Sequence, residues 1–210
     1  MVKVAPSILA ADFENLEEEI KKVELAGADY IHIDVMDGEF VTNKTEGLEM
    51  LKRSNASTNL TLDTHLMVEN PQDWIEDFFE SDIITFHLEA TDEETANKII
   101  EELHEKEIKV GISIKPGTDI KEVLEYLPYI HMVLVMTVEP GKGGQKLIPE
   151  TVFKVEYIDV NNIDIDIEVD GGINSENAQE LQDKGANILV VGTSIINSED
   201  YTDRINVLKK

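Results

Sequence analysis

Histidine and carboxylate side chains interrupt three otherwise apolar stretches of the chain. His32 and Asp34 lie two residues apart, Asp63 and His65 repeat that spacing, and Asp170 ends a third stretch. A buried carboxylate without a partner is costly, so these groups need a common explanation. A shared divalent metal is one, because imidazole and carboxylate together suit zinc, iron, manganese or cobalt. The alternative is a set of salt bridges among these side chains that fills the same space without a metal. The candidate ligands are His32, Asp34, His65 and Asp170.

The spacing of two residues is that of one face of a β-strand. It predicts three such faces: His32, Asp34 and Met36; Asp63, His65 and Met67; and Glu168 with Asp170. Methionine at a strand end usually fills the core. Three around one polar site, Met36, Met67 and Met136, would instead form an apolar lining that keeps water from a reactive intermediate.

Glycine-rich segments occur at the ends of three apolar stretches, at residues 139–145, 170–174 and 190–194. Glycine lets the main chain approach an anion closely, and the loops after the last strands of a barrel often bind phosphate. Each segment alone also fits a plain turn. Three at one site, beside a helix start, favour a phosphate site, which main-chain N–H groups can form whatever the net charge.

Short β-branched runs alternate with longer amphipathic ones along the whole chain. Strands are expected at residues 2–9, 30–35, 60–67, 83–88, 109–114, 132–138, 163–169 and 187–191. Helices are expected at residues 13–26, 71–79, 93–106, 120–127, 149–159, 175–184 and 200–208. This alternation predicts parallel strands with right-handed crossovers, and eight units predict one (β/α)8 barrel domain over residues 1–210. An open doubly wound sheet is disfavoured, because no G-x-G-x-x-G follows the first strand.

Composition excludes several classes of protein. The 210 residues include 18 Lys and Arg against 44 Asp and Glu, a net charge of −26, which argues against binding to nucleic acid or to anionic membranes. Without cysteine there is no disulfide, thiolate nucleophile or Cys-ligated metal. The apolar runs fall short of the ~20 residues that span a bilayer, and the N-terminal segment lacks the apolar core of a secretory signal. We therefore expect a soluble, cytoplasmic protein.

Five segments together resemble the ribulose-phosphate 3-epimerase family: residues 5–13, 32–38, 62–67, 135–141 and 168–172. The resemblance implies a (β/α)8 TIM barrel of the ribulose-phosphate binding type. It also implies an isomerase of the pentose phosphate pathway that interconverts D-ribulose 5-phosphate and D-xylulose 5-phosphate. The expected cofactor is one divalent metal ion per subunit, zinc or iron first and manganese or cobalt next. A sugar phosphate is the expected partner, and the resemblance is compatible with a homo-oligomer.

The resemblance also assigns roles to single residues. Its metal ligands fall on His32, Asp34, His65 and Asp170, and its two acid/base carboxylates on Asp34 and Asp170. Its substrate contacts fall on Ser7, His65, Gly141, Lys142, Gly143, Gly144, Gly171, Gly172, Gly192 and Thr193, and its intermediate-lining methionines on Met36, Met67 and Met136. The implied reaction removes the C3 proton beside the C2 carbonyl and returns a proton on the opposite face through an enediolate.

The chain departs from the family pattern in three loops. Glu39 and Thr42 lie in a segment that usually reads His-Phe-Val-Pro-Asn, and Lys44 follows that segment. Lys142 stands where Phe is usual, and Thr193-Ser194 replaces Ser-Ala. All four proposed metal ligands are intact, so these departures put the identity of the substrate in question more than the type of reaction. The alternatives are an epimerase of a related ketose phosphate, such as D-allulose 6-phosphate, and an inactive sugar-phosphate-binding protein. The second would be expected to have lost Asp34 or Asp170.

Overall fold

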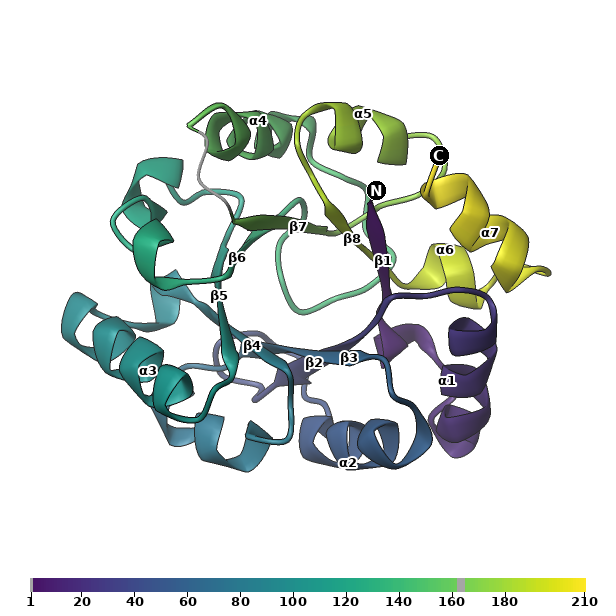
Figure 1. Ribbon diagram of the computed structural model, residues 1–210, viewed down its shortest axis with the longest axis horizontal. Coiled ribbons are helices and arrows are strands. Elements are labelled where there is room, and N and C mark those ends of the chain that lie inside the picture. Colours follow the sequence, from purple (N-terminus) through teal and green to yellow (C-terminus); the bar gives the residue numbers. More distant parts are fainter. Residues whose placement is uncertain (1, 162–164) are drawn as a thin grey trace.

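A computed structural model describes residues 2–161 and 165–210 and shows eight parallel strands enclosed by helices (Figure 1). The strands are β1 (Lys3–Pro6), β2 (Tyr30–Met36), β3 (Thr61–Met67), β4 (Ile83–His87), β5 (Lys109–Ile114), β6 (Met132–Met136), β7 (Asp166–Asp170) and β8 (Ile188–Val191). Their order in the sheet is β1-β8-β7-β6-β5-β4-β3-β2, and a parallel bridge between Ser7 and His32 joins β1 to β2. The expected (β/α)8 barrel is confirmed. Residues 163 and 164 of the seventh expected strand lie outside the described residues.

The α-helices pack around the strands. They are α1 (Leu16–Leu25), α2 (Gly47–Ser57), α3 (Glu93–Glu105), α4 (Val152–Val160), α5 (Ala178–Asp183), α6 (Thr193–Ile196) and α7 (Tyr201–Leu208). Short 3-10 helices take up several connections: η1 (Ile8–Ala10), η2 (Phe13–Asn15), η3 (Pro71–Asp73), η4 (Ile75–Phe78), η5 (Leu88–Ala90), η6 (Ile120–Val123), η7 (Leu127–Tyr129) and η8 (Pro149–Thr151).

Sequence periodicity was a weaker guide to the helices than to the strands. α2 was not expected, because its few apolar residues give a weak pattern; packing of Met50 and Leu51 against the barrel stabilises it. The expected helix at 71–79 is wrong: η3 and η4 replace it, and the buried Ile75 and Phe78 are spaced three residues apart, as a 3-10 turn requires. The expected helix at 120–127 is likewise reduced to η6, followed by η7 with Pro128.

The two faces of the strands have different chemistry. Outward side chains such as Ile33, Val135 and Val169 are fully buried against the helices and form the main core. Inward side chains are mixed: Tyr30, Met132 and Ile188 form a small apolar cluster, whereas His32, Asp63 and Glu168 are polar and fully buried. A parallel strand buried on both faces normally reads as an apolar run, so the polar inward groups mark a functional region.

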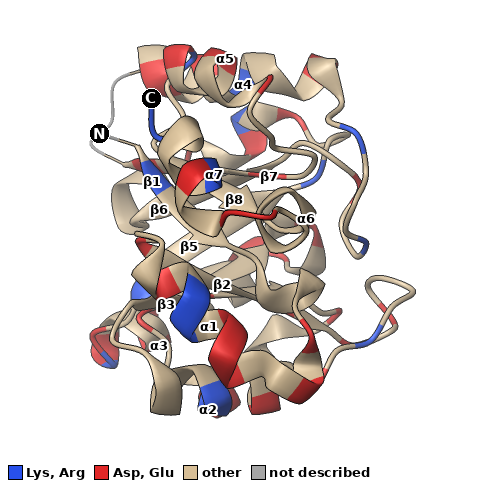
Figure 2. Cartoon of the chain, turned by 90° about the vertical axis from the view of Figure 1, so that its right-hand side faces the viewer, with Lys and Arg blue, Asp and Glu red and all other residues tan. Residues whose placement is uncertain are grey.

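Acidic side chains are spread over helices and loops of the barrel rather than gathered at one end (Figure 2). The high net charge therefore belongs mostly to the solvated surface and not to the interior site. No helix within residues 2–161 and 165–210 is both long and apolar enough to cross a bilayer.

Candidate active site and metal centre

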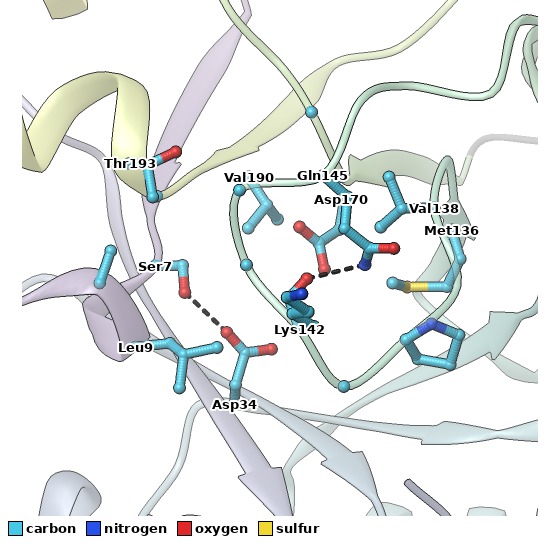
Figure 3. Close-up of a pocket in the computed structure, with 18 of the residues that line it drawn as sticks. Ser7, Leu9, Asp34, Met136, Val138, Lys142, Gln145, Asp170, Val190 and Thr193 are labelled. Atoms are coloured by element: carbon cyan, nitrogen blue, oxygen red, sulfur yellow. Dashed lines mark hydrogen bonds between the residues drawn. The ribbon is translucent and has the colours of Figure 1, made fainter. Parts of the chain in front are cut away.

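A cavity of about 310 Å³ opens at the carboxyl ends of the strands, and Asp34 and Asp170 reach it from different strands (Figure 3). Every predicted substrate-binding residue except His65 lines this cavity, as do the three predicted methionines. His65 and His32 are fully buried and are not part of the cavity wall. The volume lies within the ~300–1,000 Å³ typical of small-molecule sites.

The four predicted metal ligands converge. One candidate ligand atom from each of the four residues lies within 4.8 Å of the others. His65 Nδ1 lies 3.3 Å from Asp34 Oδ1, and His32 Nε2 lies 3.5 Å from the same oxygen. Neighbouring strands provide this closeness because Asp34 of β2 is in register with His65 of β3.

The cluster requires positive charge. His32 Nε2 is buried and has no hydrogen-bond partner among the described residues. Burial alone would lower the pKa of His32, but the carboxylates of Asp63 and Asp34 outweigh it and raise the pKa well above its usual value. The carboxylates around His32 therefore favour a cation at this position, and a divalent metal would supply one. The donor set of two imidazoles and two carboxylates fits such an ion.

The two carboxyls of the cavity differ in environment. Asp34 Oδ2 accepts a hydrogen bond from Ser7 Oγ at 2.6 Å. Burial would raise the pKa of Asp34, but the charge of His32 and hydrogen bonds with both histidines hold it far below its usual value. Burial raises the pKa of Asp170 to about 6, and the negative charge of Asp34 adds to the effect.

Three residues outside the predicted set position the site. Asp63 Oδ2 lies 2.6 Å from His32 Nδ1, and His87 Nε2 lies 2.9 Å from His65 Nε2. The hydroxyl of Thr137 donates to the main-chain oxygens of Asp170 at 2.9 Å and Gly171 at 2.6 Å, which ties the ends of β6 and β7 together. The sequence spacing places Asp63 on the same strand face as His65, but it does not predict that Asp63 pairs with His32.

Two loops meet over the cavity. The Asn43 side chain donates to the main-chain oxygen of Gly141 at 2.7 Å, so the segment after β2 contacts the glycine loop after β6. Within that glycine loop, Gln145 Nε2 donates to the main-chain oxygen of Lys142 at 2.8 Å (Figure 3). It also donates to the main-chain oxygen of Glu139 at 2.7 Å. Lys142 is exposed at the rim of the cavity. The departures at Glu39, Thr42 and Lys44 flank this contact.

Buried below the cavity is one further carboxyl, Glu168. Neither of its oxygens has a hydrogen-bond partner among the described residues. Burial raises the pKa of Glu168 well above its usual value, and the nearby Asp63 carboxylate adds to the effect. Its buried position beside the Asp63 carboxylate therefore disfavours the charged form of Glu168.

Comparison with known proteins agrees with this arrangement. Residues 3–196 match the family model described as "Ribulose-phosphate 3 epimerase family". A ribulose-phosphate 3-epimerase of Mycobacterium tuberculosis is 39% identical over 99% of this chain and 91% of the relative. One from Oryza sativa, named as the cytoplasmic isoform, is 38% identical over 99% of this chain and 93% of the relative. The solved structure of KGPDC from Streptococcus mutans covers 100% of this chain and 96% of its own, with a TM-score of 0.74 at 12% identity, a likeness of fold. The chain therefore belongs to the ribulose-phosphate 3-epimerase family of isomerases.

Proposed function

We propose that the protein is a metal-dependent 3-epimerase that interconverts D-ribulose 5-phosphate and D-xylulose 5-phosphate. The observation that carries the proposal is the convergence of His32, Asp34, His65 and Asp170 at a cavity that is also lined by glycine-rich loops. The names of the relatives support the substrate.

His32, Asp34, His65 and Asp170 would hold one divalent ion, with zinc or iron favoured and manganese or cobalt also suited to the donor set. When bound, the ion supplies a Lewis acid that stabilises negative charge developing on the sugar's carbonyl oxygen.

The chain's own carboxylates carry the proton. Asp34 and Asp170 approach the cavity from β2 and β7, on different sides of the barrel mouth. One carboxylate removes the proton from C3, which leaves a planar enediolate. The other carboxyl delivers a proton to the opposite face of that carbon and inverts it. Which residue acts as base depends on the direction of the reaction.

The remaining cavity residues bind and shield the substrate. Main-chain N–H groups of the loops at 141–144, 171–172 and 192–193 would hold the phosphate, which fixes the register of the sugar. The exposed Lys142 at the rim adds a positive charge there. Met36, Met67 and Met136 give the wall an apolar lining that excludes water from the intermediate.

Exchange of the C3 proton in D₂O tests the proposal. D-Ribulose 5-phosphate and D-allulose 6-phosphate are offered in parallel, each with and without a chelator. We expect chelator-sensitive deuterium incorporation at C3, faster with the pentulose. Faster exchange with the hexulose would mean that the substrate is a hexulose phosphate and not the pentulose phosphate. No exchange with either sugar in folded, zinc-loaded protein would reduce the function to binding.

We also propose that the protein acts in the cytoplasm, for which the name of the rice relative is the support. Immunolocalisation or cell fractionation in the source organism checks this.

A further inference from the structure

A buried histidine pair lies behind the cavity. His65 Nε2 and His87 Nε2 are 2.9 Å apart, and both rings are fully buried. At that distance the two nitrogens share a single proton, with one ring donating and the other accepting. The direction of this hydrogen bond decides whether His65 Nε2 carries a proton, and so whether Nδ1, the nitrogen that faces Asp34, can offer a lone pair.

Glu89 settles the direction. Its Oε2 lies 3.1 Å from His87 Nδ1, and its Oε1 accepts from the main-chain N–H of Lys115 at 2.7 Å and from the Thr118 hydroxyl. A carboxylate that receives three such contacts is an acceptor only, so His87 Nδ1 carries the proton. The Nε2 atom of the neutral His87 ring must then accept, and His65 Nε2 must donate. This direction is the one that a metal on His65 Nδ1 needs, because the single proton of the ligating ring then lies on Nε2, while Nδ1 lies 3.3 Å from Asp34 Oδ1.

We propose that Glu89 and His87 are positioning residues that fix the tautomer and orientation of His65, so that its Nδ1 presents a lone pair to the metal. The inference rests on the proposed metal site and extends it by one layer of residues. The other proposed imidazole ligand, His32, is also held by a carboxylate, but without an intervening ring: Asp63 Oδ2 lies 2.6 Å from His32 Nδ1. Each imidazole is thus held by a carboxylate, one directly and one through an intervening ring.

The surroundings keep the histidine pair dry. The Phe40 ring packs against His87 in a tilted arrangement with centroids 4.8 Å apart, and Lys115 Nζ lies 3.7 Å from the Phe40 centroid. Phe40 belongs to the loop that meets Gly141 over the cavity. Exclusion of water matters because a water molecule would otherwise satisfy either nitrogen of His65 and leave the tautomer unspecified.

Zinc affinity, measured by competition with a chromophoric chelator, tests the proposal. His87→Leu removes the acceptor, and we expect a dissociation constant raised about 10–100-fold. His87→Gln places an amide oxygen near the position of Nε2, and we expect a value within about threefold of the unmodified protein. His104→Leu is the matched control: the exposed His104 lies in the last turn of α3 and packs on His131, just before β6, at the opposite end of the strands from the relay, so zinc affinity should not change. An unchanged affinity in His87→Leu, or an equal loss in His87→Gln, would overturn the proposal.

A double-mutant cycle asks whether the two residues act as one unit. Glu89→Gln alone should weaken zinc binding, whereas His87→Leu with Glu89→Gln should be no weaker than His87→Leu alone. Additive losses would mean that Glu89 acts elsewhere, and would refute the relay.

Nitrogen NMR of histidine-labelled protein gives a readout that does not need the metal. In the zinc-free protein at pH 8, we expect the proton between the two rings to lie on His65 Nε2 and a second proton to lie on His87 Nδ1. A proton on His87 Nε2 with none on His87 Nδ1 would refute the relay. If the unmodified protein binds no zinc, the proposed metal site fails, while these tautomers still decide whether the relay exists.

Discussion

Three glycines of the cavity loops form a natural series for testing how the site is built. Gly172 has a φ of +69°, and a Cβ there would lie 2.4 Å from the main-chain nitrogen of Leu147 and 2.8 Å from the oxygen of Gln145. Gly144 has nearly the same φ, +72°, but no atom within 4 Å of that position, and Gly143 has equally open space without the left-handed φ. Alanine at the three positions therefore separates backbone strain from steric overlap.

The expected losses follow from these geometries. Gly143→Ala should be neutral or stabilising by ~0.4–1 kcal/mol, because alanine lowers the entropy of the unfolded chain. Gly144→Ala adds ~1–2 kcal/mol for the left-handed conformation, for a net loss of ~1 kcal/mol. Gly172→Ala carries the same strain and also pushes against main-chain atoms, which adds ~1–3 kcal/mol, so we expect a total loss of ~2–4 kcal/mol.

Urea unfolding followed by the fluorescence of the single tryptophan measures all three variants. The same titration with added inorganic phosphate reports binding, since a ligand of the folded state raises its stability. We expect phosphate to stabilise Gly143→Ala as it does the unmodified protein, and to stabilise Gly172→Ala much less. Equal losses of stability in Gly144→Ala and Gly172→Ala would refute the argument from the 2.4 Å contact.

Three further predictions concern single side chains. Asp170→Asn should lower the turnover number by at least ~100-fold without lowering the urea midpoint, because it removes a proton carrier and leaves a neutral side chain of the same size; near-normal turnover would exclude that role. Lys142→Phe should raise the Michaelis constant for D-ribulose 5-phosphate about 3–10-fold with little change in turnover number, whereas an unchanged constant would place the ammonium in solvent. Lys154→Met should destabilise the fold by ~2–4 kcal/mol, because its buried ammonium donates to three main-chain oxygens of the 115–118 loop at 2.7–2.8 Å; a urea midpoint equal to that of the unmodified protein would contradict this.

The strands and the inner faces could be predicted from sequence for a simple reason. β-Branched runs favour strands, and a period of two assigns each polar residue to a face without any knowledge of the partner strand. The spacing of His32 and Asp34 is therefore enough to place both side chains on one face of β2. The helices were harder, because α2 depends on packing against the barrel rather than on its own periodicity.

The partners of the site residues were beyond the reach of sequence, because they depend on register between strands. His32 lies opposite Asp63, and Asp34 opposite His65, in the pairing of β2 with β3. A shift of one residue would send these side chains to the opposite face of the sheet. The contact between His65 and His87 likewise requires the particular pairing of β3 with β4.

The alternation of strands and helices, the inward-facing residues and the glycine loops are local properties of the chain, so the order of the amino acids is enough to predict them. Two features of the site are not local: Asp34 and Asp170, which are far apart in the chain, share one cavity, and Glu89 reaches His65 through His87. Closure of the barrel brings the ends of distant strands around one mouth, and register sets which nitrogen faces which oxygen. Both are long-range properties that no short segment of sequence contains.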